Sequence, residues 1–64
     1  MKYEILISQI WKSNYAEVYY KVLQTSKYDV EMYDLDNIWN CIKISKKELN
    51  NHFILKEDFF EVSK

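Results

Sequence analysis

The sequence predicts a small all-β protein, a strongly bent antiparallel sheet of about four to six strands with one short helical turn near residues 46–51. Apolar and polar residues alternate along most of the chain, which is typical of strands with one buried face. The alternation stops where Ser45 is followed three residues later by Glu48, the spacing of a helix capping box. Sixty-four residues make at most one domain, so we expect residues 1–64 to fold as a unit.

Four segments carry the alternation, and polar turns separate them. We expect strands at Tyr3–Trp11, Tyr15–Leu23, Tyr28–Leu35 and Ile38–Ile44, with shorter extended pieces at Phe53–Leu55 and Asp58–Val62. The chain has no glycine, and Asn14 and Asn37 stand in two of the turns. Asparagine tolerates the left-handed backbone found in such turns, so it can take the place of glycine there.

The helical turn is expected to begin after Ser45 and to cover Lys46 to about Asn51. Leu49 and Phe53 are four residues apart, so both can pack onto the sheet from one side of this turn. The residues assigned to the inward face form the expected core, which consists of Ile5, Ile7, Trp11, Val18, Tyr20, Val22, Val30, Met32, Ile38, Ile42, Ile44, Leu49, Phe53 and one of Phe59 and Phe60.

Two arrangements of the sheet are compatible with this pattern. Closure into a barrel would bury one face and remove both edges, and the general layout of the predicted elements is similar to SH3-like small barrels. The alternative is an α+β fold, an open meander of strands with the helical turn over one end.

The composition argues against a dedicated nucleic-acid-binding domain. The chain has nine basic and ten acidic residues, a formal net charge of −1, and every basic residue is a lysine. Nucleic-acid-binding domains are usually basic and gather arginine with lysine on one face. Glycine, proline and arginine, whose codons are rich in G and C, are absent. This bias indicates an AT-rich coding sequence, such as that of a low-GC bacterium or its phage.

Residues suited to catalysis are sparse. The single histidine, His52, and the single cysteine, Cys41, do not form a cluster of metal ligands. A chain without glycine has no phosphate-binding loop, dinucleotide fingerprint or nucleophile elbow. We therefore expect no enzymatic activity, no cofactor and no metal. The unpaired cysteine and the lack of a signal-like or long apolar segment predict a cytoplasmic protein without membrane contact.

A second set of aromatic residues falls on the face opposite the expected core. Tyr15, Tyr19, Tyr33 and Trp39 are interleaved there with charged residues, whereas a solvated face is normally charged and polar. The sheet could coil tightly enough to cover both faces, or the rings could bind a protein or serve as a stacking platform for bases. Interleaved acids and missing arginine disfavour the platform, whereas tyrosine and tryptophan are enriched at interface hot spots.

We therefore predict a non-enzymatic protein-interaction module that binds another protein or a second copy of itself. The expected anchors are Tyr15, Tyr19, Tyr33 and Trp39, and the charged groups expected to set orientation are Lys43, Lys46 and Lys47 with the acidic strip of residues 29–36. Size and composition suit a phage or mobile-element accessory protein that blocks a host factor. The alternative is a small β-barrel that binds single-stranded nucleic acid or a nucleotide by ring stacking.

Overall fold

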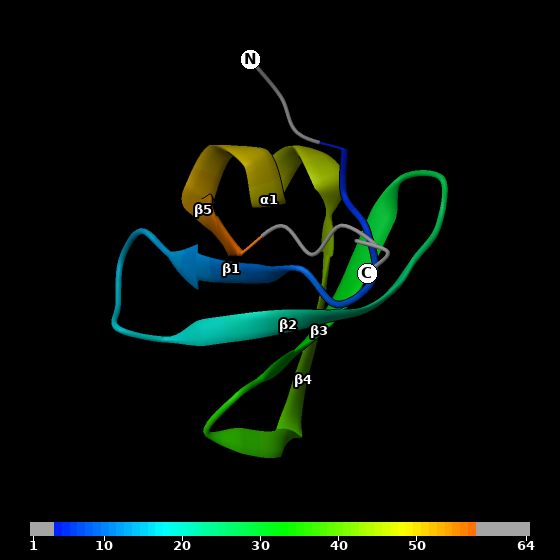
Figure 1. Cartoon of the computed structure of the whole chain (residues 1–64). Helices are drawn as coiled ribbons and strands as arrows, with labels where there is room; N and C mark the ends of the chain where they lie inside the picture. The colour runs from blue at the N-terminus through cyan, green and yellow to red at the C-terminus, as the bar shows by residue number, and fades with distance from the viewer. Residues whose placement is uncertain (1–3, 58–64) are drawn as a thin grey trace, which may run out of the picture.

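The protein is an antiparallel sheet with one short helix across it. The computed structural model describes residues 4–57 (Figure 1). Its elements are β1 (Ile10–Ser13), β2 (Tyr19–Thr25), β3 (Asp29–Asp34), β4 (Asn37–Ser45), α1 (Lys46–His52) and β5 (Phe53–Glu57). The predicted fold class, a bent antiparallel sheet with one helical turn, is confirmed, whereas the expected extended piece Asp58–Val62 lies outside the described residues.

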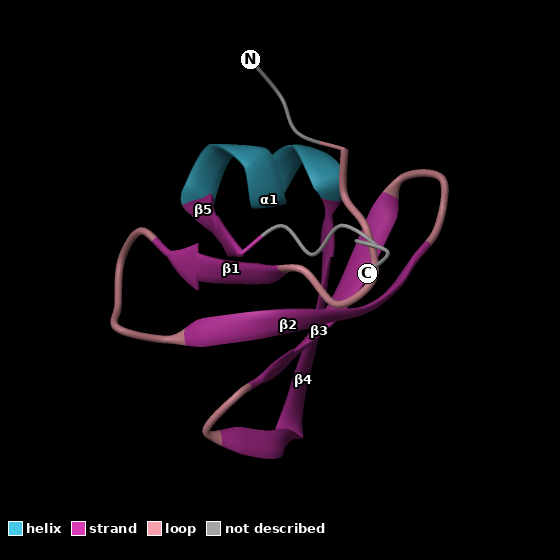
Figure 2. Ribbon diagram, in the orientation of Figure 1, coloured by secondary structure: helices cyan, strands magenta, loops and turns pink. Residues whose placement is uncertain are grey.

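The strands follow one another in the sheet except for the last, which returns to the other edge. The order is β4-β3-β2-β1-β5, and every neighbouring pair is antiparallel. After β4, α1 carries the chain over one face, so that β5 pairs with β1 (Figure 2). Because β4 and β5 occupy opposite edges, the sheet formed by residues 4–57 is open, so the closed barrel, one of the two expected arrangements, does not form.

The first strand is much shorter than the sequence predicts. Strand β1 begins at Ile10, because Ser8 adopts a left-handed backbone conformation with φ of 79° and makes a turn there. A turn of this kind interrupts the alternation of inward and outward side chains. Ile5 is still buried, but Ile7, which we expected in the core, is 59% exposed.

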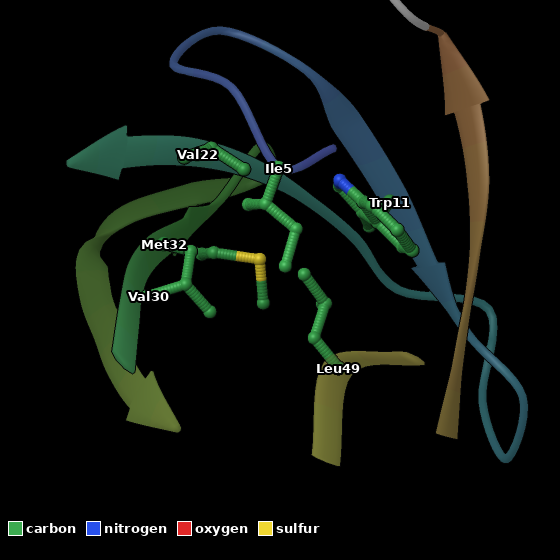
Figure 3. Close-up of a cluster of buried hydrophobic side chains, with 6 residues drawn as sticks. All are labelled: Ile5, Trp11, Val22, Val30, Met32 and Leu49. Atoms are coloured by element: carbon green, nitrogen blue, oxygen red, sulfur yellow. The ribbon is translucent and has the colours of Figure 1, made fainter. Parts of the chain in front are cut away.

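The core lies between the sheet and α1. Its buried apolar side chains come from the N-terminal segment, β1, β2, β3 and α1, and they are Ile5, Trp11, Val22, Val30, Met32 and Leu49 (Figure 3). Five partly buried residues pack against them: Tyr20, Ile42, Ile44, Phe53 and Leu55. Val18, which precedes β2, is half-buried, and Phe59 and Phe60 lie outside the described residues.

Ile38 is the second residue that we placed in the core wrongly, since it is 60% exposed. The register between β3 and β4 explains this. Tyr33 pairs with Cys41, but the next residue of β3, Asp34, pairs with Asn37. Residues 38–40 therefore have no partners on β3, and the alternation that holds from Cys41 to Ser45 does not extend back to Ile38.

The capping pattern forms as the sequence predicts. The Glu48 N–H donates to Ser45 Oγ over 3.0 Å, and the Ser45 N–H donates to Glu48 Oε1 over 3.4 Å. This reciprocal pair occupies donors that the first turn of a helix leaves unpaired. Leu49 is the buried residue of α1, and the Phe53 ring meets that of Tyr20 edge-on, so both predicted contacts of the helical turn with the core are made.

Candidate protein-interaction surface

The face of the sheet away from α1 is crossed by a row of paired residues. Ile10 pairs with Lys21, Lys21 with Tyr33, and Tyr33 with Cys41, so these four side chains share the outer face. Tyr33 is half-buried within this row. Its predicted outward direction is therefore correct, but the ring is a partly covered member of the sheet surface.

Four exposed apolar residues, among them the most exposed one, Trp39, lie near one end of the sheet. The tip patch consists of Tyr19, Leu35, Ile38 and Trp39, all exposed. The last three belong to the hairpin between β3 and β4, and the Leu35 N–H donates to the Tyr19 carbonyl over 2.9 Å. That bond brings the hairpin beside the start of β2. Two predicted anchors, Tyr19 and Trp39, thus lie on elements that meet at this end of the sheet, together with two aliphatic residues.

The irregular start of β4 explains the exposure of the tip patch. Asn37 Oδ1 accepts a hydrogen bond from the Trp39 N–H over 3.2 Å, and Asp34 Oδ1 accepts one from the Asp36 N–H over 2.8 Å. These side-chain bonds occupy backbone donors that have no ladder partner on β3. The indole of Trp39 is left 88% exposed. A large aromatic side chain in this position is available for contact.

Tyr15 lies elsewhere and has a local partner. Its hydroxyl oxygen is 2.7 Å from His52 Nδ1, and the two rings lie 5.5 Å apart. The Asn14 N–H also donates to the His52 carbonyl over 2.9 Å. These contacts hold the loop between β1 and β2 against the end of α1. The structure therefore separates Tyr15 from the tip patch.

The three predicted lysines lie at the end of β4 opposite the tip patch. Lys43 pairs across the ladder with Glu31, and Lys46 and Lys47 begin α1. Beside them is a shallow depression of about 50 Å³, lined by Gln24, Thr25, Ser26, Asp29, Glu31 and Lys43. The predicted site residues thus occupy separate regions, with apolar anchors at the tip and basic groups at the far end of the same strand.

Sequence reasoning missed Leu35 and Ile38 as members of the tip patch. Leu35 was taken as the end of an alternating strand and Ile38 as the start of the next. The signal that could have found them is the polar turn between them, because Asp36 and Asn37 favour turn conformations and place their neighbours at an exposed hairpin end.

Among residues 4–57, no three His, Cys, Asp or Glu side chains are grouped so that they could hold a metal ion. The described part of the chain has no helix with the length and apolar character needed to cross a membrane. No protein-family model, curated protein or solved structure matches the chain.

Proposed function

We propose that the chain is a non-enzymatic protein-interaction module whose tip patch contacts another protein. The observation that carries this proposal is the exposure of Trp39 among further apolar residues at one hairpin end. Burying a tryptophan removes on the order of 150–250 Å² from water. Tryptophan and tyrosine also dominate interface hot spots. Leu35 and Ile38 add aliphatic area beside the ring, which suits an apolar pocket on the partner.

The test compares Trp39, on β4 near the last residue of β3, with Tyr28, which precedes the first residue of β3. Full-length protein is immobilised and used to capture proteins from the source cells, and captured proteins are quantified by mass spectrometry. The Trp39→Ala variant is expected to lose specifically captured proteins, because the anchor is gone. Tyr28→Ala is the matched control, since Tyr28 is 69% exposed but lies just before β3 at its other end.

Stability must be measured on the same samples. Trp39 has little contact with the core, so Trp39→Ala and Tyr28→Ala are both expected to melt within a few degrees of the unaltered chain. If Trp39→Ala captures the same proteins as the unaltered chain, the tip patch is not the contact surface. If both variants lose the captured proteins, capture depends on exposed aromatic side chains in general and not on the tip patch.

A second candidate, binding of single-stranded nucleic acid, is favoured by one arrangement on the outer face. Lys21 pairs with Tyr33 and is two residues from Tyr19, so a cation lies among rings on one face. Under the main proposal, titration with mixed-sequence oligonucleotides at low salt gives no binding. Under the alternative, binding appears, weakens steeply with salt and drops in Lys21→Ala.

The setting we propose is the cytoplasm of a low-GC bacterium or its phage, where the chain would act as an accessory protein that occupies a surface of a host factor. Cys41 is an exposed, unpaired thiol, which suits a reducing compartment. The lack of glycine, proline and arginine supports an AT-rich genome. A small module that acts by covering a surface needs an anchor and no catalytic group, and Trp39 supplies that anchor.

A further inference from the structure

We propose that the partner of the tip patch is a protein surface that presents basic side chains around an apolar centre, and that these pair with carboxylates beside Trp39. The proposal rests on the proposed function, because it names the chemistry of what the tip patch would bind. The apolar part of the contact is already defined by the four residues of the tip patch. The charges next to them decide which partner fits.

The hairpin that carries most of the tip patch has only negative charge. Residues 28–42 include no lysine and four acids, which are Asp29, Glu31, Asp34 and Asp36. Asp34 and Asp36 stand at the turn itself, where Asp34 pairs with Asn37 across the ladder. The hairpin projects beyond the other strands, at the end of the molecule away from α1 (Figure 1). The exposed ring of Trp39 therefore lies on an acidic projection.

The carboxylates at this turn have no basic partner among residues 4–57. Asp34 Oδ1 accepts from the Asp36 N–H over 2.8 Å, which is a bond within the turn. Asp36 is exposed and Asp34 is half-buried. A cation brought to the tip by a partner would therefore meet negative charge that the protein does not neutralise itself.

The lysines of the outer face do not change this balance. Lys12 pairs across the ladder with Tyr19, but its ammonium already lies 3.6 Å from the Glu17 carboxylate. Lys21 and Lys43 lie in the next two cross-strand rows away from the tip. The negative charge of the hairpin is thus left uncompensated beside the apolar residues.

A basic rim on the partner complements this arrangement. An acidic group placed beside the tip would be repelled by Asp36, whereas a guanidinium or ammonium there gains an opposite charge. Arginine suits the position, because its guanidinium stacks on aromatic rings and also pairs with carboxylates. Trp39 follows Asp36 by three residues, so their Cα atoms lie at most about 11 Å apart. One group of basic side chains can therefore contact both.

The indole at the centre of the contact can also report on it. Trp39 is 88% exposed, and Trp11, the other tryptophan, is 1% exposed. A ligand that covers the tip should shift the emission of Trp39 to shorter wavelength and protect it from acrylamide, while Trp11 stays shielded. The probes are three short amphipathic peptides with the same leucines, whose polar positions are all arginine, all serine or all glutamate.

The full chain is expected to bind the arginine peptide most tightly and the glutamate peptide least. Asp36→Asn keeps a residue that turns favour and should weaken binding of the arginine peptide about twofold to fivefold, the range of an exposed ion pair. Salt at about 1 M should remove most of the preference for arginine, because the Debye length falls to about 3 Å. Glu57→Gln is the matched control, since it removes an exposed carboxylate from β5 at the opposite edge. Its affinity should stay unchanged.

Several results would overturn the proposal. Equal binding of the three peptides, or no change of Trp39 emission with any of them, would show that basic groups are not recognised at the tip. An equal loss of affinity in Glu57→Gln and Asp36→Asn would show that net charge, and not the turn, attracts the arginine peptide. A shift of Trp39 emission on concentrating the protein alone would assign the tip to a second copy, and a shift with mixed-sequence oligonucleotides would assign it to nucleic acid.

Failure of this proposal is distinguishable from failure of the proposed function. Asp36→Asn leaves every apolar residue of the tip patch in place, whereas Trp39→Ala removes the anchor. Capture of proteins that is lost in Trp39→Ala but unchanged in Asp36→Asn would keep the contact and refute the basic partner. Capture that is unchanged in both variants would refute the contact itself.

Discussion

Gln9 is the side chain whose replacement tests the architecture most directly. It is fully buried, although it is polar, and its amide holds three parts of the structure together. Oε1 accepts from the Leu6 N–H over 2.9 Å and from Trp11 Nε1 over 3.1 Å, and Nε2 donates to the Glu4 carbonyl over 2.9 Å. Gln9→Met keeps an unbranched side chain of similar length but removes these three bonds.

The expected loss of stability follows from these contacts. A buried polar group that loses its partner costs about 1–3 kcal/mol, and this applies to the Trp11 indole, which is almost fully buried. The bonds to Leu6 and Glu4 are only partly buried, so each adds less. We expect a total of about 2–4 kcal/mol. The free energy of unfolding of a domain of this size is roughly 3–10 kcal/mol. The substitution therefore removes a large share of it.

Urea unfolding followed by tryptophan fluorescence and circular dichroism measures this loss, and the melting temperature should fall by roughly 10–30 °C. Gln24→Met is the matched control, because Gln24 is an exposed residue of β2. Its unfolding free energy should stay within about 0.5 kcal/mol of the unaltered chain. An equally small change for Gln9→Met would refute the role that we give to the buried amide.

A double-mutant cycle isolates the bond to the indole. Trp11→Phe removes the Nε1 donor, so Gln9→Met should cost about 1 kcal/mol less in that background than in the unaltered chain. If the cost is the same in both backgrounds, the loss comes from the backbone bonds to Leu6 and Glu4. The cycle therefore separates anchoring of the N-terminal segment from support of the core tryptophan.

Three further changes probe the remaining contacts. Leu49→Ala leaves a cavity in the core and should cost about 2–5 kcal/mol in urea unfolding, whereas Leu35→Ala at the exposed tip should cost less than about 1 kcal/mol. Ser45→Ala removes the cap of α1 and should cost about 0.5–2 kcal/mol, and an unchanged stability would show that the cap is dispensable. Tyr15→Phe removes an exposed hydrogen bond to His52, so calorimetry should show that the free energy of unfolding falls by less than about 1 kcal/mol.

Much of the fold could be predicted from the sequence because local signals and burial agree in β3, in β4 from Cys41 and in α1. The third and fourth strands and the helix were expected within one or two residues of their bounds. Val22, Val30 and Met32 alternate with polar residues and are buried as expected. From Asp29 to Tyr33 and from Cys41 to Ser45 the period-two pattern coincides with a regular β3–β4 register, so the predicted and observed faces agree there.

The rest could not be predicted because it depends on backbone irregularities without a clear sequence signal. The left-handed turn at Ser8 ends the alternation of the first segment, and serine is not the residue that usually marks such a turn. Residues 38–40 interrupt the β3–β4 register within an apparently regular apolar run. Gln9 falls on the inward side of the expected alternation, between Ile5 and Trp11, but its hydrogen bonds to the Leu6 N–H and the Glu4 carbonyl depend on a turn that the pattern does not predict.

The proposed contact at the tip patch depends on the division of β4 into two parts. From Cys41 to Ser45 the strand is in register with β3 and contributes Ile42 and Ile44 to the core. From Asn37 to Asn40 it has left that register, and its apolar side chains are exposed. Substitution of Ile42 or Ile44 should therefore alter stability, whereas substitution of Ile38 or Trp39 should alter binding with little change in stability. This separation is what makes Trp39→Ala an interpretable test of function.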